Sequence, residues 1–372
     1  MRRRRTTALV VCGLVVCGTL ALLGALPAIG VSRSHAAPAV DVVQRPRAVP
    51  HTAPVSKRVD PNASVTLAWG GDTVLGSDYG LPPARGRTML AHVAPIFRAA
   101  DVGWVNLEEA LSDGTSSKCA GSTSGACFAF GAPMSFASTL PASGIRIVNL
   151  ANNHADDYGA SGQASTLAAL RAAHVAWDGK PGQIEVLTVN GVRVAFLGFA
   201  PYQWASRLDH IPAAVALVKR AAAQADVVVV AMHAGAEGSD AVHVPSGTEY
   251  FLGENRGNSR AFTHAVIDAG ADLVVGSGPH VIRGVQWYRG KLIGWRTFGM
   301  GGTLSESGIV TVTLRGDGRV TAAKWTPLAL VTPGVPVVDS SGASTRLVAQ
   351  LSREDFGASG ARFKPDGTIV VP

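Results

Sequence analysis

The feature that most constrains the fold is an alternation of short hydrophobic runs, rich in β-branched residues, with Ala-rich stretches of helical periodicity. The hydrophobic runs are residues 65–69, 102–107, 145–150, 192–199, 227–232, 273–275 and 292–295. Between them, residues 164–173, 211–225 and 259–269 have the spacing of amphipathic helices. Strands that alternate with helices form layered domains in which the helices cover the sheets. The sequence therefore predicts an α/β fold.

The last third of the chain adds an antiparallel element to this pattern. Residues 309–314 and 320–325 are strand-like and flank a short segment that contains Asp317-Gly318, a dipeptide typical of hairpin turns. Residues 343–351 predict a final helix. A hairpin among strands that are joined by helices predicts mixed sheets.

Five of the hydrophobic runs are followed directly by polar side chains that can bind metal ions. These are Asp72, Asn106 with Glu108, Asn152 to His154, His233, and His280. Each residue alone has an ordinary explanation as a turn residue, a helix cap or a hydrogen-bonded core histidine. Together they are expensive to bury, at about 1–3 kcal/mol for each unpaired group. In open α/β sheets the ends of neighbouring strands converge, so the pattern indicates a site for one or two divalent ions such as Mn, Fe or Zn.

The order and spacing of these motifs over residues 65–330 resemble those of the CapA family of capsule and poly-γ-glutamate synthesis proteins. The motifs are residues 71–76, 106–108, 152–159, 233–237 and 270–281. The resemblance implies a calcineurin-like metallophosphatase fold, a layered α/β/β/α sandwich of mixed sheets with flanking helices. It also implies a dinuclear metal centre.

The resemblance assigns roles to individual residues. The metal ligands would be Asp72, Glu108, Asn153, His233 and His280. Among them Glu108 would bridge the ions and Asn153 would bind the second one. His154 would protonate the leaving group, with Asp157 holding its ring in orientation. Glu237 and Arg283 would contact the substrate.

Two positions depart from the family pattern. Many relatives have His where this chain has Ser277 or Gly278, and an Asn is replaced within residues 297–301, where Met300 stands. One ion in place of two, or a retained fold with little catalysis, therefore remains an alternative.

The first residues predict export. Four Arg follow Met1, residues 7–31 are apolar, and small residues surround Ala36, as in a secretory signal. The apolar stretch is also long enough to span a bilayer of about 30 Å, so an uncleaved anchor is the alternative. We expect a leader at 1–36, a Pro- and Ala-rich linker at 37–63, the CapA-like domain at 64–332, and a C-terminal extension packed on it at 333–372. Cys119 and Cys127 bracket a Gly- and Ser-rich loop and predict a disulfide in an oxidising compartment.

Charge and composition exclude some classes of function. The net charge is +7, but residues 1–36 contain five Arg and no acidic residue, so the remainder carries 7 − 5 = +2. The remainder contains neither a stripe of Lys and Arg nor aromatic residues interleaved with basic ones. Nucleic-acid binding is therefore not expected. Aromatic residues make up 6% of the chain, which is low for a carbohydrate-binding module.

These observations lead to one expected function and one alternative. We expect an extracytoplasmic protein, secreted or membrane-anchored, that processes a capsule or other anionic envelope polymer as a metal-dependent hydrolase of phosphoester or amide bonds. The alternative is a non-catalytic envelope protein that assists export or anchoring of the polymer.

Overall fold

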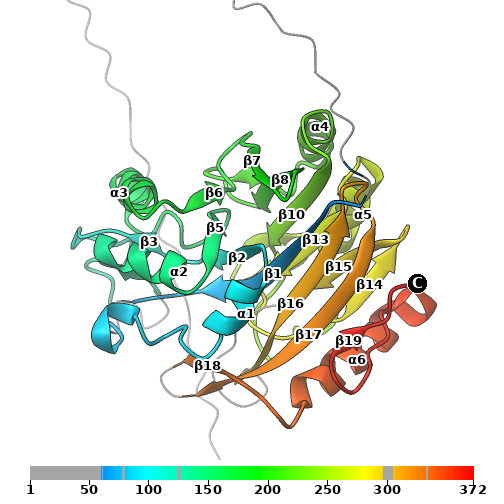
Figure 1. The fold of residues 1–372 in the computed structure, drawn as a ribbon. Helices are drawn as coiled ribbons and strands as arrows, with labels where there is room; N and C mark the ends of the chain where they lie inside the picture. The colour runs from blue at the N-terminus through cyan, green and yellow to red at the C-terminus, as the bar shows by residue number, and fades with distance from the viewer. Residues whose placement is uncertain (1–59, 61, 78–79, 124–126, 296–304, 332–333) are drawn as a thin grey trace, which may run out of the picture. The chain divides into compact units, whose positions relative to one another are not determined.

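Two mixed β-sheets pack face to face in the computed structural model, which describes residues 60, 62–77, 80–123, 127–295, 305–331 and 334–372 (Figure 1). All of these residues fall within one unit of contacts, Ser56–Pro372. The predicted leader and most of the predicted linker lie outside the described residues. Within the described part, no helix combines the length and hydrophobicity needed to cross a membrane.

The first sheet has the strand order β18-β17-β16-β1-β2-β5-β6, with β19 paired to β17. Its strands are β1 (Ser64–Thr73), β2 (Val102–Leu107), β5 (Ile145–Asn149), β6 (Ala176–Asp178), β16 (Glu306–Arg315), β17 (Val320–Val331), β18 (Val335–Val338) and β19 (Thr368–Ile369). β1 lies parallel to β2 and antiparallel to β16, so the parallel part of this sheet meets the predicted hairpin of β16 and β17 at β1.

The second sheet has the order β14-β15-β13-β10-β8-β7, with β9 paired to β8. Its strands are β7 (Glu185–Val189), β8 (Val192–Ala200), β9 (Ser206–Arg207), β10 (Val227–His233), β13 (Leu273–Ser277), β14 (Val285–Tyr288) and β15 (Lys291–Trp295). β8, β10, β13 and β15 run parallel. Two small sheets, β3 (Ala110–Leu111) with β4 (Gly131–Ala132) and β11 (Glu249–Phe251) with β12 (Glu254–Gly257), complete the set of described strands.

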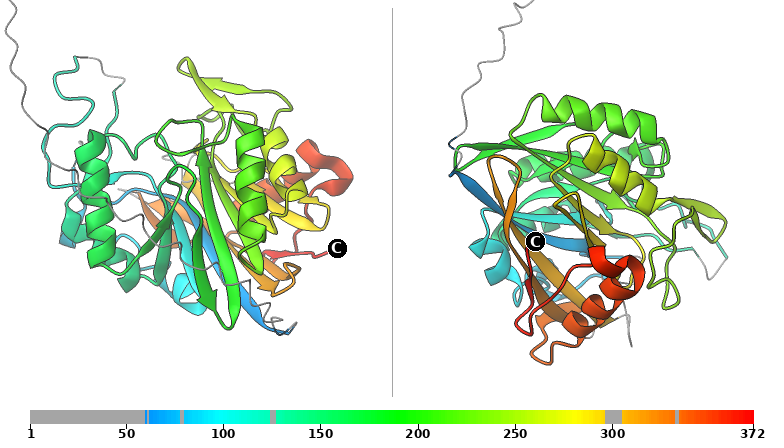
Figure 2. Two further views of the ribbon diagram at one scale, coloured as in Figure 1. Left: turned by 90° about the horizontal axis from the view of Figure 1, so that it is seen from above. Right: turned by 90° about the vertical axis from the view of Figure 1, so that its right-hand side faces the viewer.

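Helices cover the outer faces of both sheets. α1 (Ala94–Ala99), α2 (Thr139–Ala142) and α3 (Gly159–Ala172) share a hydrophobic cluster with the outer residues of β1, β2 and β5. α4 (Ile211–Ala222) and α5 (Ser259–Asp268) pack on β8, β10 and β13 (Figure 2). α6 (Ala343–Phe356) contacts β14, β16 and β17, and short 3-10 helices occupy Pro83–Gly86, Met134–Ser138 and Gly357–Ser359. The predicted α/β/β/α sandwich is therefore confirmed.

The main core lies between the sheets and follows from the two-residue period of the strands. Leu67 and Trp104 of the first sheet share one cluster with Phe196 and Val229 of the second. The Trp104 ring meets Trp69 at 4.7 Å and Phe196 at 5.1 Å, both edge to face. The indole of Trp69 also donates a hydrogen bond to the carbonyl of Gly276 in the opposite sheet at 3.3 Å. The two sheets are thus held in a defined relation at their carboxyl ends.

The C-terminal segment contributes to the first sheet. β18 and β19 both pair with β17, and Val348 and Leu351 of α6 belong to the inter-sheet core. The boundary predicted at residue 332 therefore falls within the first sheet, because β18 and β19 lie beyond it and pair with β17.

Candidate metal centre

The polar residues of the centre continue the core stripes of their strands. In β2, Val102 and Trp104 face the second sheet, and Asn106 follows two residues later on the same face. In β10, Val229 and Ala231 face the first sheet, and His233 follows them. The same spacing that builds the core therefore delivers buried polar side chains to the space between the carboxyl ends of the sheets.

Hydrogen-bonded side chains form a row across the first sheet. The Asn106 amide donates to Asp72 Oδ1 at 2.6 Å, and the Asn149 amide donates to Asn106 Oδ1 at 2.6 Å. The strands place these residues opposite one another in register. Asn152 also donates to Asn106 Oδ1 at 3.2 Å, and to the Leu107 carbonyl at 2.9 Å. Asn106 and Asn149 fix the orientation of Asp72, a role that sequence reasoning did not assign to them.

Three predicted ligands converge behind this row. Asp72, Glu108 and His233 are buried, and their ligand atoms lie within 4.8 Å of one another. His233 Nδ1 is 3.4 Å from Asp72 Oδ1, and His233 Nε2 is 3.6 Å from Glu108 Oε1. Among the described residues, neither Glu108 Oε1 nor Asn153 Oδ1 has a hydrogen-bond partner, although both atoms are buried. The unpaired oxygen of Glu108 beside the His233 imidazole fits a bound divalent cation.

Asp72 is held as a carboxylate. Burial alone would raise its pKa, but the charge of His233, its hydrogen bond and the charge of His280 outweigh burial and lower the pKa to about 2. The backbone N–H of Gly278 donates to Asp72 Oδ2 at 3.0 Å. Gly278 has a φ of +116°, and an added Cβ would lie 2.9 Å from the backbone of Ala234. A residue with a side chain would therefore be strained at position 278, one of the two positions at which the resemblance implied a His.

His280 and Glu237 lie at the rim of the group. His280 Nε2 is 3.5 Å from Glu108 Oε1, and its Nδ1 is 3.5 Å from Glu237 Oε2. Burial would lower the His280 pKa, but Glu108, Glu237 and Asp72 raise it to about 9. Its φ of +57° lies in the left-handed region, which residues other than Gly seldom adopt.

A buried arginine that sequence reasoning missed also borders the centre. Arg256 of β12 is 1% exposed, and its Nη1 lies 2.8 Å from Glu237 Oε1. Its Nη2 is 3.4 Å from His233 Nε2. The hairpin of β11 and β12, yellow-green in the left view of Figure 2, stands out from the body and brings Arg256 to the centre. Local periodicity in the sequence did not indicate this hairpin.

Arg283 has a different role from the substrate contact that the resemblance implied. Its side chain is fully buried, and its Nη atoms bind the Glu249 carboxylate at 2.7 and 3.0 Å. Two further N–H groups bind the carbonyls of Ala241 and Ala236. With four of its five N–H groups bound to protein oxygens, Arg283 anchors the hairpin instead of facing a ligand.

His154 and Asp157 form a hydrogen-bonded pair, with 2.6 Å between His154 Nδ1 and Asp157 Oδ2. Asp157 also binds Lys118 Nζ at 2.7 Å and accepts the backbone N–H of Phe130. The Phe130 ring stacks on His154 at 4.0 Å. Asp157 and Phe130 therefore hold the imidazole in one orientation.

The loop around this pair contains the disulfide. Cys119 and Cys127 are bonded in the structure, as the sequence predicted. Lys118 precedes the first cysteine, and Phe130 follows the second.

Two positions were expected to depart from the family pattern. The Ser277 hydroxyl lies 3.2 Å from His233 Nδ1. Met300 is outside the described residues.

Comparison with known proteins decides the family. Residues 66–306 match the model of the bacterial capsule synthesis protein PGA_cap. The chain belongs to this family. It is 29% identical over 307 residues to the capsule biosynthesis protein CapA of Bacillus anthracis, which covers 74% of this chain and 69% of that protein. It is 31% identical over 165 residues to the PGA biosynthesis protein CapA of Bacillus subtilis, 40% of either protein.

A putative 5'-nucleotidase from Staphylococcus aureus is among the solved structures that resemble this PGA_cap chain. The superposition covers 77% of this chain and 58% of the other, with a TM-score of 0.46 and 14% sequence identity.

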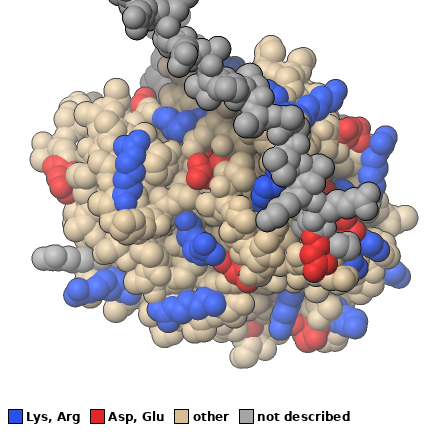
Figure 3. Space-filling model, turned by 45° about the horizontal axis from the view of Figure 1, so that its top comes forward, with Lys and Arg blue, Asp and Glu red and all other residues tan. Residues whose placement is uncertain are grey.

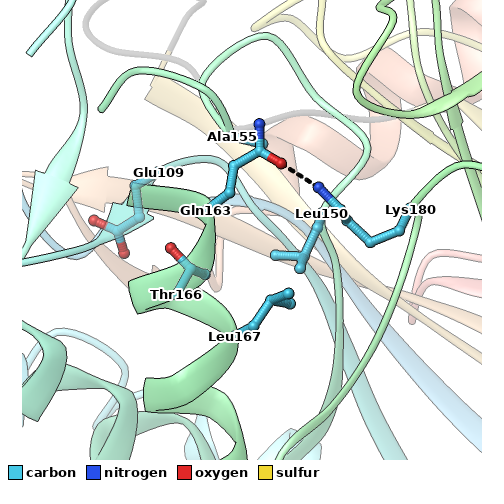
Figure 4. Close-up of a pocket in the computed structure, with 7 residues that line it drawn as sticks. All are labelled: Glu109, Leu150, Ala155, Gln163, Thr166, Leu167 and Lys180. Carbon is cyan, nitrogen blue, oxygen red and sulfur yellow. Dashed lines mark hydrogen bonds between the residues drawn. The ribbon is translucent and has the colours of Figure 1, made fainter. Parts of the chain in front are cut away.

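Glu109, another buried carboxylate of the PGA_cap chain, supports the loop after Asp72. Glu109 accepts the backbone N–H groups of Leu75 and Gly76, each at 3.0 Å. Burial raises the pKa of Glu109 to about 8, against these hydrogen bonds. Figure 4 shows its carboxylate at a small pocket, on the side away from the hydrogen-bonded Lys180 and Gln163. Glu109 therefore positions the Asp72 loop.

Proposed function

We propose that this PGA_cap chain is a metal-dependent hydrolase that acts in the synthesis or processing of a capsule or poly-γ-glutamate-like polymer. One observation carries the proposal: Asp72, Glu108 and His233 converge in a buried group. Among the described residues, a buried oxygen of Glu108 has no hydrogen-bond partner in this group, and the buried Asn153 Oδ1 has none either. Membership of a capsule-synthesis family supports the choice of polymer.

Different residues of the chain would bind the ion and donate the proton. A divalent ion held by Asp72, Glu108 and His233, with Asn153 as a further ligand, would polarise the scissile bond and lower the pKa of a water molecule. His154 donates a proton from Nε2 to the leaving group, which is an alkoxide of a phosphoester or an amine of an amide. Asp157 accepts a hydrogen bond from Nδ1 and so keeps the proton-donating nitrogen directed away from itself.

The proposal places the protein outside the cytoplasm. The basic, apolar and small residues at the start of the chain support export, with the protein secreted or held at the membrane by this segment. Its partner there would be the anionic polymer or a precursor. Neither a nucleic-acid partner nor a role inside the cell is part of the proposal.

The test compares three variants with the wild-type chain on poly-γ-glutamate and on model phosphoesters. We expect His154→Ala to lower kcat by about 10²–10⁴-fold while the bound metal is retained. Asp72→Asn should lose both metal and activity. His243→Ala is the matched control, because His243 is 57% exposed and pairs with Asp355 away from the predicted ligands.

Two results would contradict the proposal. One is a natively folded chain that binds no divalent ion at saturating concentration. The other is hydrolysis of every substrate at the wild-type rate by His154→Ala.

The second candidate function is a non-catalytic envelope protein that assists polymer export or anchoring. The observation that favours it is Gly278, whose backbone N–H, not a side-chain ligand, reaches Asp72. Metal content separates the two candidates, because only the hydrolase requires the ion.

A further inference from the structure

Arg256 brings a fixed positive charge into the candidate metal centre. Its guanidinium is buried and lies between Glu237 Oε1, at 2.8 Å, and His233 Nε2, at 3.4 Å. A guanidinium keeps its positive charge throughout the physiological pH range.

The two nitrogens of His233 face different neighbours. Nδ1 lies 3.4 Å from Asp72 and 3.2 Å from the Ser277 hydroxyl. Nε2 lies next to Arg256 and 3.6 Å from Glu108. A second ion on the Nε2 side would meet a positive guanidinium.

With His280 neutral, the charges of the centre balance with one ion. Asp72 and Glu108 supply two negative charges to the ligand group, and Glu237 is compensated by Arg256. A second divalent ion would add two positive charges next to the guanidinium. Within the described ranges, Asp72, Glu108 and His233 form the only group of three acidic, His or Cys residues close enough to bind an ion.

We propose that the centre binds one divalent ion per chain and that Arg256 occupies the position of a second cation. The inference rests on the proposed metal-dependent function. Arg256 is a positioning residue: it holds Glu237 and one side of His233, and its charge keeps a second ion out. The β11–β12 hairpin, locked by Arg283 and Glu249, keeps the guanidinium there.

The experiment measures Mn²⁺ binding by the purified full chain, using equilibrium dialysis with metal analysis and electron paramagnetic resonance. Wild type should saturate at one ion and give the spectrum of an isolated Mn²⁺. Arg256→Gln frees Glu237 and His233, and should saturate at two ions with the spectrum of a coupled pair. Arg256→Lys keeps the charge and should stay at one ion, and Glu237→Gln added to Arg256→Gln should restore one.

The outcomes separate this inference from the proposed function. Two ions in the wild-type chain overturn the single-ion centre and leave the metal-dependent function standing. A single ion in a folded Arg256→Gln chain overturns the role given to Arg256 and also leaves the metal-dependent function standing. No ion in the wild-type chain overturns the proposed function as well. The wild-type spectrum decides the ion number even if Arg256→Gln does not fold.

Discussion

Buried polar residues at the strand ends are oriented by one another rather than by solvent. Asp72, Asn106 and Asn149 continue as a row into Asp178 of β6, which pairs in register with Asn149. Asp178 accepts the Trp104 indole N–H at 3.0 Å, and an added Cβ on Gly198 of the opposite sheet would lie 2.4 Å from its Oδ1. The close approach of the sheets here thus requires glycine and leaves Asp178 away from water.

Asp178 should make stability depend on pH. Burial raises its pKa well above the ordinary Asp value, so the folded chain holds the proton more tightly than the unfolded chain. Its contribution is complete below the unfolded pKa, about 4, and is lost as pH rises through the folded pKa. From pH 5 to pH 8, Asp178→Asn should therefore gain stability over wild type, by on the order of 1–3 kcal/mol. Urea unfolding at each pH measures this difference.

Asp226→Asn is the control for this prediction. The Asp226 pKa is lowered because hydrogen bonds from Arg193 outweigh burial, so Asp226 is ionised throughout this pH range. Its stability difference from wild type should stay constant. A constant difference for Asp178→Asn as well would show that Asp178 is not buried as a neutral acid.

At the scale of elements, the β11–β12 hairpin connects the centre to the second sheet. Its residue Glu249 pairs with Arg283 and accepts the backbone N–H of Ala236 at 3.1 Å. The carbonyl of Arg256 accepts the backbone N–H of Gly235 at 2.9 Å. The segment that follows β10 is therefore bonded to both strands of the hairpin, although Tyr250 and Leu252 near the hairpin turn are 65% and 77% exposed.

Replacing Arg283, which anchors the β11–β12 hairpin, should lower the free energy of unfolding. Arg283→Met leaves Glu249 buried without its partner, and we expect a loss of about 3–5 kcal/mol in the free energy of unfolding. Arg289→Met is the control, because Arg289 is 68% exposed and pairs with the exposed Asp268; it should cost less than about 1 kcal/mol. Denaturant unfolding measures both. Equal losses would mean that the Arg283 pair contributes no more than a surface pair.

For residues Ser56–Pro372 as a whole, the candidate centre is a point where both sheets contribute to one site. Asp72 lies near the end of β1 and Glu108 directly follows β2 in the first sheet, and His233 ends β10 of the second. On the face shown in Figure 3, Lys and Arg side chains are interspersed with Asp and Glu, in agreement with the nearly balanced charge beyond the leader. Ion binding therefore couples to the packing of the two sheets.

This coupling predicts that metal stabilises the fold. Mn²⁺ at about 100 times its dissociation constant should add about 2.7 kcal/mol to the free energy of unfolding and raise Tm by several degrees. A thermal scan with and without a chelator measures the shift. Glu108→Gln should fold but show little response to Mn²⁺. An equal shift in Glu108→Gln would mean that the ion binds elsewhere.

Hydrophobic period and polar strand ends were readable in the sequence because they are local patterns. They predicted the central strands of both sheets and the helices α3 to α6, but not the edge strands β6, β7 and β14 or the short helices α1 and α2. They also predicted the acidic and imidazole residues that gather at the carboxyl ends. They also predicted the hairpin of β16 and β17, since its turn dipeptide is local. The division of the strands between two sheets follows from the family resemblance and not from period alone.

Tertiary structure decided which side chains share the centre, because their contacts join residues far apart in the chain. Arg256 reaches His233 only through the β11–β12 hairpin, which local periodicity did not indicate. Arg283 has the same charge and a similar sequence setting, yet Glu249 occupies its guanidinium. The sequence by itself thus determined the fold class and the kinds of residue that could bind an ion. Long-range packing determined which of them face it and which support the fold.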